Sequence, residues 1–228
     1  VELEDPKAGE VMVKIGAAGI CRSDRHFMHG DAKIPLPVVL GHEGAGTVEK
    51  VGPGVTSLTP GQQVILSFVP ACGRCKSCRE GNANLCDTHM ATGAFMYDGT
   101  CRLHKGGQDI HHMGKVACFA EYAVLPETGC VPMSATIPMD IAAMIGCCVP
   151  TGVGAVLYSA DVKPGSTVAV VGCGGVGLNV IMGAKLVNAA KIIAVDIRES
   201  QLEFAMKFGA THSVNASHRD PVAQVKEI

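Results

Sequence analysis

The pattern of hydrophobic and polar positions changes once along the chain, near residue 150. Before that point, short β-branched runs at residues 10–15, 46–51, 63–67 and 119–124 alternate with turns rich in Gly and Pro. Short strands separated by turn residues predict an irregular, mainly antiparallel β unit or barrel. We therefore expect a first domain at residues 1–150 that is built mainly of strands.

After residue 150 the pattern becomes one of alternating strands and helices. An apolar run at 167–171 is followed by glycines, a helical stretch at 176–188, a second apolar run at 191–195 and a helical stretch at 199–208. This order predicts parallel βαβ units with right-handed crossovers. The expected fold class is α/β with a mainly-β first domain, and the second domain, at residues 151–228, is expected to hold part of a doubly wound parallel sheet.

Residues 87–115 follow neither pattern. The segment is polar and rich in Gly and His, and its apolar positions show little periodicity. We expect a long loop there.

Composition narrows the class of partner. Hydrophobic residues make up 47% of the chain, enough for a core, and the net charge of -2 gives no general attraction to nucleic acid or anionic membranes. No apolar run approaches the roughly 20 residues that span a bilayer, and residues 1–6 do not resemble a signal peptide. A small-molecule partner and a cytoplasmic location are therefore expected.

The chain begins without Met and stops at 221–228 with no closing element, so we expect a fragment of a longer protein.

The glycines after the run at 167–171 match a dinucleotide-binding motif. Its members, with the residue between the last two glycines, are Gly172, Gly174, Gly175, Val176 and Gly177. Gly172 makes the tight turn, Gly174 lets the backbone approach a pyrophosphate, and Gly177 lets the helix sit close to the strand. The phosphates would lie against the positive end of that helix. The alternative is an ordinary turn between a strand and a helix.

Asp196 ends the second apolar run, where a carboxylate would accept hydrogen bonds from the adenosine ribose. The same charge would repel a 2′-phosphate, so the sequence predicts NAD rather than NADP. Arg198 leaves the alternative open, because an Arg at this place could serve a 2′-phosphate.

Four of the eleven cysteines lie close together in the sequence: Cys72, Cys75, Cys78 and Cys86. Spacings of two residues let successive sulfurs converge on one ion, and four thiolates form the closed shell of a structural zinc site. Such a centre has a formal charge of -2, and we expect Arg74, Lys76 and Arg79 to offset it. A redox C-x-x-C pair, scattered buried thiols and a zinc-ribbon nucleic-acid module are the alternatives. Aromatic residues, at 4%, are too few to favour the last.

Further motifs carry a family resemblance. They are GICRSD at 19–24, GHEG at 41–44, and Gly146-Cys147 followed by Thr151-Gly152. With the four cysteines, they occur in the order found in the zinc-containing medium-chain alcohol dehydrogenases. The chain resembles that family nearly end to end, and it looks most similar to the long-loop branch of class I, class III and related bacterial enzymes.

The resemblance implies a GroES-like first domain that is followed by a partial Rossmann domain. It also implies a catalytic zinc held by Cys21, His42 and Cys147, with Glu43 beside the metal and Asp24 orienting His42. Cys147 matches better than Cys148, because the ligand in this family directly follows a Gly, here Gly146, and lies four residues before a Thr, here Thr151. Either thiolate would suit zinc.

Two thiolates and an imidazole leave a neutral zinc site with one open position. Such an ion is a Lewis acid toward an alcohol oxygen, and the nicotinamide takes the hydride. By resemblance, Ser23 and His26 relay the proton to solvent and Arg22 contacts the pyrophosphate. The resemblance also implies that Thr151 lies near the nicotinamide and that Phe68 forms a wall of the substrate pocket. A turn-capping Ser, a solvated His and a core Phe are the alternatives.

Three positions depart from the family. Gln201 replaces a basic residue that contacts adenosine, Ala32 replaces an acid of the glutathione-dependent formaldehyde branch, and His26 replaces the Tyr of that branch. We therefore expect simple alcohols, aromatic ones among them, as substrates of a zinc- and NAD-dependent dehydrogenase. A polyol or threonine dehydrogenase, and a catalytically incomplete zinc- and nucleotide-binding fragment, are the alternatives. The full-length protein is expected to form a homodimer or homotetramer.

Overall fold

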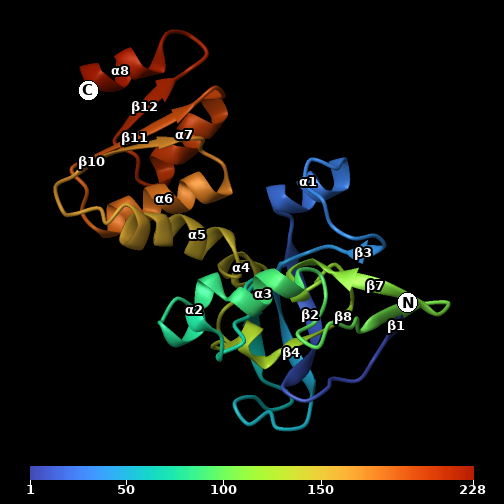
Figure 1. The fold of residues 1–228 in the computed structure, drawn as a ribbon. Helices are drawn as coiled ribbons and strands as arrows, with labels where there is room; N and C mark the ends of the chain where they lie inside the picture. The colour runs from blue at the N-terminus through green and yellow to red at the C-terminus, as the bar shows by residue number, and fades with distance from the viewer. The chain divides into compact units, whose positions relative to one another are not determined.

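A computed structural model describes all of residues 1–228. The chain divides into two compact units, Val1–Cys147 (unit 1) and Cys148–Ile228 (unit 2). Figure 1 shows the course of the chain through both units, and each is described here by itself.

Unit 1 is built on a five-stranded sheet in the order β8-β2-β4-β5-β9, and every neighbouring pair is antiparallel. The strands are β2 (Glu10–Gly19), β4 (Glu43–Val51), β5 (Gln63–Leu66), β8 (Tyr122–Pro126) and β9 (Cys130–Pro132). The mainly antiparallel β architecture expected from the sequence is confirmed.

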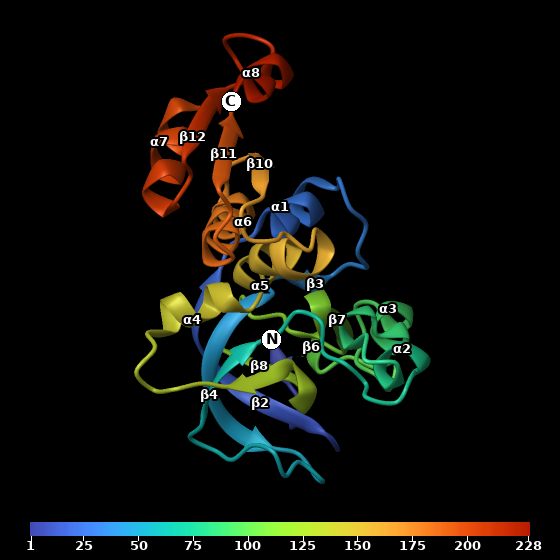
Figure 2. The same cartoon turned by 90° about the vertical axis from the view of Figure 1, so that its left-hand side faces the viewer.

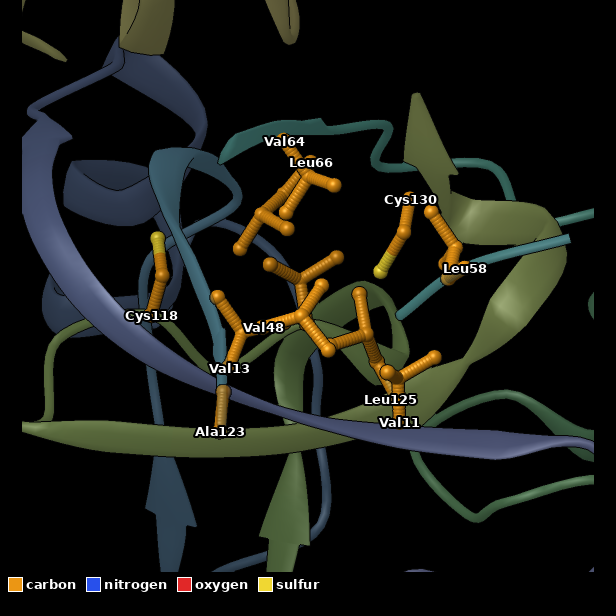
Figure 3. Packing of buried hydrophobic residues seen from close by; sticks show 11 residues of the cluster. Val11, Val13, Val48, Leu58, Val64, Leu66, Cys118, Ala123, Leu125 and Cys130 are labelled. Atoms are coloured by element: carbon orange, nitrogen blue, oxygen red, sulfur yellow. The ribbon is translucent and has the colours of Figure 1, made fainter. Parts of the chain in front are cut away.

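The core of unit 1 lies against one face of this sheet. Val11 and Val13 of β2 point to the same side because alternate residues of a strand share a face. In Figure 3 they meet Val48 of β4 and Leu125 of β8. Each of these side chains is almost completely buried, which stabilises the fold by about 1.5–3 kcal/mol per residue as an upper estimate.

A second cluster places helix α4 (Met139–Ile145) on the sheet. Ala142 and Ala143 of the helix pack with Ala45 of β4 and Ile65 of β5. The small alanines let the helix approach closely, and this contact fixes the chain directly before Cys147.

A second sheet, in the order β1-β6-β7-β3, corrects the sequence-based expectation of a long loop at 87–115. Its strands are β1 (Glu2–Leu3), β6 (Leu103–Lys105), β7 (Gln108–His112) and β3 (Val38–Val39), and helix α3 (Asp87–Thr92) precedes the hairpin of β6 and β7 in the chain. The expectation was wrong because β6 and β7 are too short to show a periodicity. They form a hairpin whose outer edges pair with β1 and β3, which lie far away in the sequence.

A buried ion network joins the two sheets. The Arg102 guanidinium donates to both carboxylate oxygens of Glu10, at 2.6 and 2.9 Å, and to Asp98 at 2.8 Å. The backbone amide of Arg102 donates to Nε2 of His112 at 2.9 Å. Because the charges are paired, the network is compatible with its burial.

The other helical segments of unit 1 are short. They are α1 (Arg22–His29), α2 (Lys76–Arg79) and the 3-10 turns Ala83–Leu85, Met113–Lys115 and Glu127–Gly129. Helices α2 and α3 pack against one another, as Figure 2 shows.

Unit 2 alternates helices and strands around a parallel sheet in the order β10-β11-β12. Its elements are α5 (Cys148–Gly154), a π-helical turn (Ala155–Ser159), β10 (Thr167–Val171), α6 (Gly175–Leu186), β11 (Lys191–Asp196), α7 (Glu199–Phe208), β12 (His212–Asn215) and α8 (Pro221–Glu227). The expected partial Rossmann fold is confirmed.

Both faces of the central strand β11 are covered, as its unbroken apolar run predicts. Ile192 and Ala194 pack in one cluster with residues of α6 and α7. Ile193 and Val195 pack in the other with Val225 of α8.

No single helix of the chain is long and apolar enough to cross a membrane. Met139–Ile145 and Cys148–Ser159 reach the required length and hydropathy only when they are counted together.

Candidate functional site

Four residues with metal-binding side chains converge in unit 1: Cys21, His42, Glu43 and Cys147. Their potential ligand atoms all lie within 4.8 Å of one another. Cys21 precedes α1, His42 directly precedes β4, Glu43 is the first residue of β4, and Cys147 follows α4. Two thiols, an imidazole and a carboxylate in one small volume form a donor set that suits zinc.

Glycines allow this convergence. A Cβ atom at Gly19 would lie 2.5 Å from Oε2 of Glu43, and one at Gly146 would overlap the carbonyl oxygen of Leu66. A larger residue at Gly146 would displace the chain before Cys147, and one at Gly19 would displace the Glu43 side chain. The glycines in the recognised motifs therefore have a steric role next to the ligands.

Asp24 organises the backbone around the cluster. Its carboxylate is completely buried and accepts hydrogen bonds from the backbone amides of Cys21, at 2.9 Å, and Gly41, at 3.0 Å. Oδ1 also lies 3.4 Å from Nδ1 of His42, although the geometry is not that of a hydrogen bond. One carboxylate thus fixes the chain beside two potential ligands, and it faces one nitrogen of the imidazole.

Phe68 and Ser23 lie beside members of this cluster, and His26 lies on helix α1, which Cys21 precedes. The rings of Phe68 and His42 meet edge to face, with centroids 5.8 Å apart. The Ser23 hydroxyl lies 3.7 Å from the Cys21 sulfur. His26 is half-buried, and its Nδ1 lies 3.1 Å from a carboxylate oxygen of Asp31. The sequence-based reasoning did not single out Asp31.

The four cysteines of the second motif also converge. The sulfurs of Cys72, Cys75, Cys78 and Cys86 lie within 4.8 Å of one another. The Cys86 sulfur accepts hydrogen bonds from the amides of Cys72, at 3.3 Å, and His89, at 3.4 Å. Ser77 of α2 donates from its hydroxyl to Asp87 of α3 at 2.8 Å, which ties the two helices of this segment together.

Local hydrogen bonds and burial shift the pKa values of these thiols in opposite directions. Hydrogen bonds from the Thr88 side chain and the Arg74 amide lower the pKa of Cys72 to about 6. A hydrogen bond from the Cys78 backbone lowers the pKa of Cys75. Burial, and then the hydrogen bond with Cys75, raises the pKa of Cys78 to about 12. The cluster thus contains sulfurs that are ready to be thiolates beside one that a cation would have to deprotonate.

In unit 2 the glycine turn has the geometry of a phosphate-binding loop. Gly172 has φ of 89°, a conformation that side chains disfavour, and Gly174 precedes α6. A Cβ atom at Gly177 would overlap the Gly172 carbonyl oxygen, whereas Gly174 and Gly175 have open space around them. The backbone at the N-terminus of α6 is therefore accessible.

Asp196 supports the same loop. One carboxylate oxygen accepts a hydrogen bond from the Cys173 amide at 2.8 Å, and the other accepts one from the Arg198 amide at 3.0 Å. Burial alone would raise the pKa of Asp196, but these amides and that of Ile197 outweigh it and hold the pKa below its usual value. The Arg198 side chain is exposed, with Nε 3.9 Å from the carboxylate.

Comparison with known proteins identifies the family. Residues 7–135 match the alcohol dehydrogenase GroES-like domain, and residues 175–228 match the zinc-binding dehydrogenase domain. The chain belongs to the zinc-dependent medium-chain alcohol dehydrogenase family. It is thus a member of a family of oxidoreductase enzymes whose substrates are small molecules.

Several solved structures of this family are similar to the chain. An alcohol dehydrogenase zinc-binding domain protein from Burkholderia ambifaria is 37% identical, with a TM-score of 0.93 over 99% of this chain and 62% of that one. Benzyl alcohol dehydrogenase from Acinetobacter calcoaceticus is 36% identical, with a TM-score of 0.88 and the same coverage. Acetophenone reductase from Geotrichum candidum, in complex with NAD, is 30% identical, with a TM-score of 0.78 over 94% of this chain and 58% of that one. The chain therefore spans about three fifths of the length of these relatives.

The remaining predicted residues lie in different surroundings. Arg22 is exposed on α1, and Thr151 is exposed on α5. Arg74, Lys76 and Arg79, which were expected to balance the charge of the four thiolates, lie at or near the surface. The sequence-based reasoning also missed Lys115. This buried residue lies in the segment that we expected to be a loop, and nothing in the local sequence distinguishes it.

Proposed function

We propose that the complete protein is a zinc- and NAD-dependent alcohol dehydrogenase that interconverts an alcohol with its aldehyde or ketone. The observation that carries this proposal is the convergence of Cys21, His42, Glu43 and Cys147. These residues come from separate parts of unit 1, and packing of apolar residues alone does not require their side chains to meet.

The donor set fits a catalytic zinc. Cys21, His42 and Cys147 would hold the ion, and Glu43 lies beside them within the same 4.8 Å. Nδ1 of His42 faces Asp24, which leaves Nε2 as the ligand atom. A carboxylate behind a ligating imidazole is a common arrangement in zinc sites, because it orients the ring and increases its basicity.

When bound, zinc would supply Lewis acidity toward the substrate oxygen, and NAD would supply the acceptor of the hydride. The side chains of this chain would do the rest. The Ser23 hydroxyl would accept the proton of the alcohol, since Ser can donate and accept at once. His26, oriented by Asp31 at 3.1 Å, would release that proton to solvent.

The nucleotide would bind to unit 2. The backbone of Gly172–Gly177 and the N-terminus of α6 would receive the pyrophosphate, with Arg22 as a further cation for it. Asp196 would accept hydrogen bonds from the ribose, because each of its carboxylate oxygens has a second lone pair beyond the amide that it already binds. Its negative charge disfavours a 2′-phosphate, so we propose NAD as the cofactor. Thr151 is proposed to lie near the nicotinamide.

The four-cysteine cluster would hold a structural zinc. Its sulfurs lie close enough together to share one ion. Four thiolates leave no open position, so this ion would stabilise the segment from Cys72 to Cys86 without taking part in the reaction.

We further propose an aromatic alcohol as the substrate. The edge-to-face contact of Phe68 with His42 would present an aromatic wall beside the reacting centre. The similarity to a benzyl alcohol dehydrogenase, at 36% identity, supports the same class. For the full-length protein we propose a homodimer or homotetramer, to be checked by light scattering.

Metal analysis of the purified protein tests the centre. We expect one zinc for each of the two ligand clusters. Cys21→Ala and Cys147→Ala should each remove one zinc and abolish activity, because the catalytic ion would lose one of its two thiolates. Cys148→Ala is the matched control and should retain both. Loss of zinc from Cys148→Ala but not from Cys147→Ala would refute the ligand assignment.

Activity should be measured on the 228-residue chain and on the full-length protein, with benzyl alcohol and ethanol as substrates and with NAD and NADP. The dehydrogenase proposal predicts that the full-length protein reduces NAD in preference to NADP and favours benzyl alcohol. If both forms bind zinc and NAD without turnover of any alcohol, the chain is instead a zinc- and nucleotide-binding unit.

A further inference from the structure

Lys115 lies in a place that is unfavourable for a lysine. Its side chain is completely buried, and its backbone has φ of 61°, in the left-handed region. Gly114 before it and Ala117 after it also have positive φ. A buried ammonium and a left-handed backbone both oppose folding, and such strain persists where the surrounding structure compensates for it.

The first compensation comes from helix α3. Nζ of Lys115 donates to the carbonyl oxygens of His89, at 3.1 Å, and Gly93, at 2.9 Å. These carbonyls belong to the last turn of the helix and to its C-cap, the end at which the helix dipole is negative and attracts cations. The same helix begins directly after Cys86, whose sulfur accepts the amide of His89. Lys115 therefore caps the helix that positions one of the four thiols.

The second compensation comes from Tyr97. Nζ lies 5.4 Å from the centroid of its ring, within the range of a cation–π contact. The Tyr97 hydroxyl donates to the carbonyl oxygen of Pro70 at 2.5 Å. Pro70 lies two residues before Cys72, the first cysteine of the cluster. The ammonium is thus connected to both ends of the cysteine segment.

Both hydrogen bonds of the Lys115 ammonium go to carbonyl oxygens. No carboxylate lies within ion-pair distance of it. Burial lowers the pKa of Lys115 to about 8, and the charge of Cys86 opposes this shift. Cys86, one of the four cysteines of the cluster, is thus the acidic group whose charge acts on Lys115. Arg74, Lys76 and Arg79 lie at or near the surface, where water screens their charges.

We propose that the Lys115 ammonium is the internal counter-ion of the four-cysteine centre and a positioning residue for its zinc. Four thiolates around a dication carry a formal charge of -2, which a buried cation stabilises far more than an exposed one. The hydrogen bonds to α3 and the contact with Tyr97 place that cation. This inference rests on the proposed structural zinc.

The test is the rate of zinc transfer from the protein to excess chelator at pH 7, where Lys115 carries its charge. Lys115→Met keeps the length and the apolar stem of the side chain but removes the charge. We expect it to release one zinc about 10- to 100-fold faster, the usual effect of losing an outer-shell partner. The other zinc, identified by its absence from Cys21→Ala, should leave at the wild-type rate. Lys76→Met, which removes an exposed cation of the same segment, is the matched control and should behave as the wild type.

Two further variants decide the matter if Lys115→Met does not fold. Lys115→Arg keeps the charge and should release the same zinc at a rate close to that of the wild type. Tyr97→Phe keeps the ring but removes the hydrogen bond to Pro70, so it should release that zinc faster. A wild-type rate in folded Lys115→Met or Tyr97→Phe, or a Lys115→Arg protein that releases the zinc as fast as Lys115→Met, would overturn the inference, even if the thermal stability of the variants fell. A wild-type protein without zinc in the four-cysteine cluster would instead refute the proposed function on which the inference rests.

Discussion

Replacing Asp24 by an asparagine tests whether one buried carboxylate holds the catalytic ligands in place. Asp24 is completely buried and accepts two backbone amides, at 2.9 and 3.0 Å. The asparagine side chain would keep only one acceptor oxygen and would present an NH₂ group to the other amide. A hydrogen bond to a charged group contributes about 1.5–3 kcal/mol, and a buried amide left without a partner costs about 1–3 kcal/mol more. The expected loss in the free energy of unfolding is therefore about 2.5–6 kcal/mol.

Urea denaturation of the zinc-free protein measures this loss without a contribution from the metal. Asp5→Asn is the control, because the Asp5 side chain is 76% exposed and its ion pair with Lys50 lies at the surface. That pair should contribute no more than about 1 kcal/mol. With zinc present, Asp24→Asn should also lose the catalytic zinc, since Cys21 and His42 would no longer be held. If the unfolding free energy falls by less than about 1 kcal/mol and both zinc ions remain, Asp24 does not organise the site.

Two further predictions concern the nucleotide unit and the response to pH. Gly177→Ala should lower the stability of unit 2 by about 1–3 kcal/mol, because its Cβ would overlap the Gly172 carbonyl. Gly175→Ala is the control and should leave stability unchanged, since open space surrounds that position. Equal thermal shifts of the two variants would contradict this. Burial, and then the charge of Arg102, lowers the pKa of His112 to about 4 from 6.5. The unfolded chain therefore takes up a proton at a higher pH than the folded one, and stability should fall by roughly 3 kcal/mol as the pH drops from 6.5 to 4. His112→Gln should flatten that part of the curve in urea titrations at each pH, and an unchanged slope would show that other groups cause it.

The sequence alone predicted the parts of the fold that depend on interactions between residues close together in the chain. In unit 2, the apolar run at 191–195 and the helical stretch at 199–208 correspond to β11 and α7. The glycine turn at 172–177 was recognisable because each glycine meets a demand that arises within a few residues. The four cysteines were recognisable for the same reason, since a spacing of two residues brings sulfurs together locally.

The cluster of Cys21, His42, Glu43 and Cys147 was only partly predictable from the sequence. Its members were found in the sequence only because their flanking motifs resemble those of a family. Cys21, His42 and Cys147 are far apart in the chain, and spacing alone could not show that they meet. The packing of α4 on the five-stranded sheet and the two hydrogen bonds of Asp24 bring them together.

Only the tertiary structure revealed the second sheet and the surroundings of Lys115. The hairpin of β6 and β7 owes its place to pairing with β1 and β3, and such pairing leaves no periodic signal in short strands. Lys115 follows that hairpin, and its burial against α3 and Tyr97 follows from contacts that are distant in sequence. Local patterns record the interactions of neighbours along the chain, so they determined the glycine turn, the cysteine motif and the βαβ order. Contacts between distant segments depend on how the elements pack, and that packing decided where the ligands converge and which cation lies beside the thiolates.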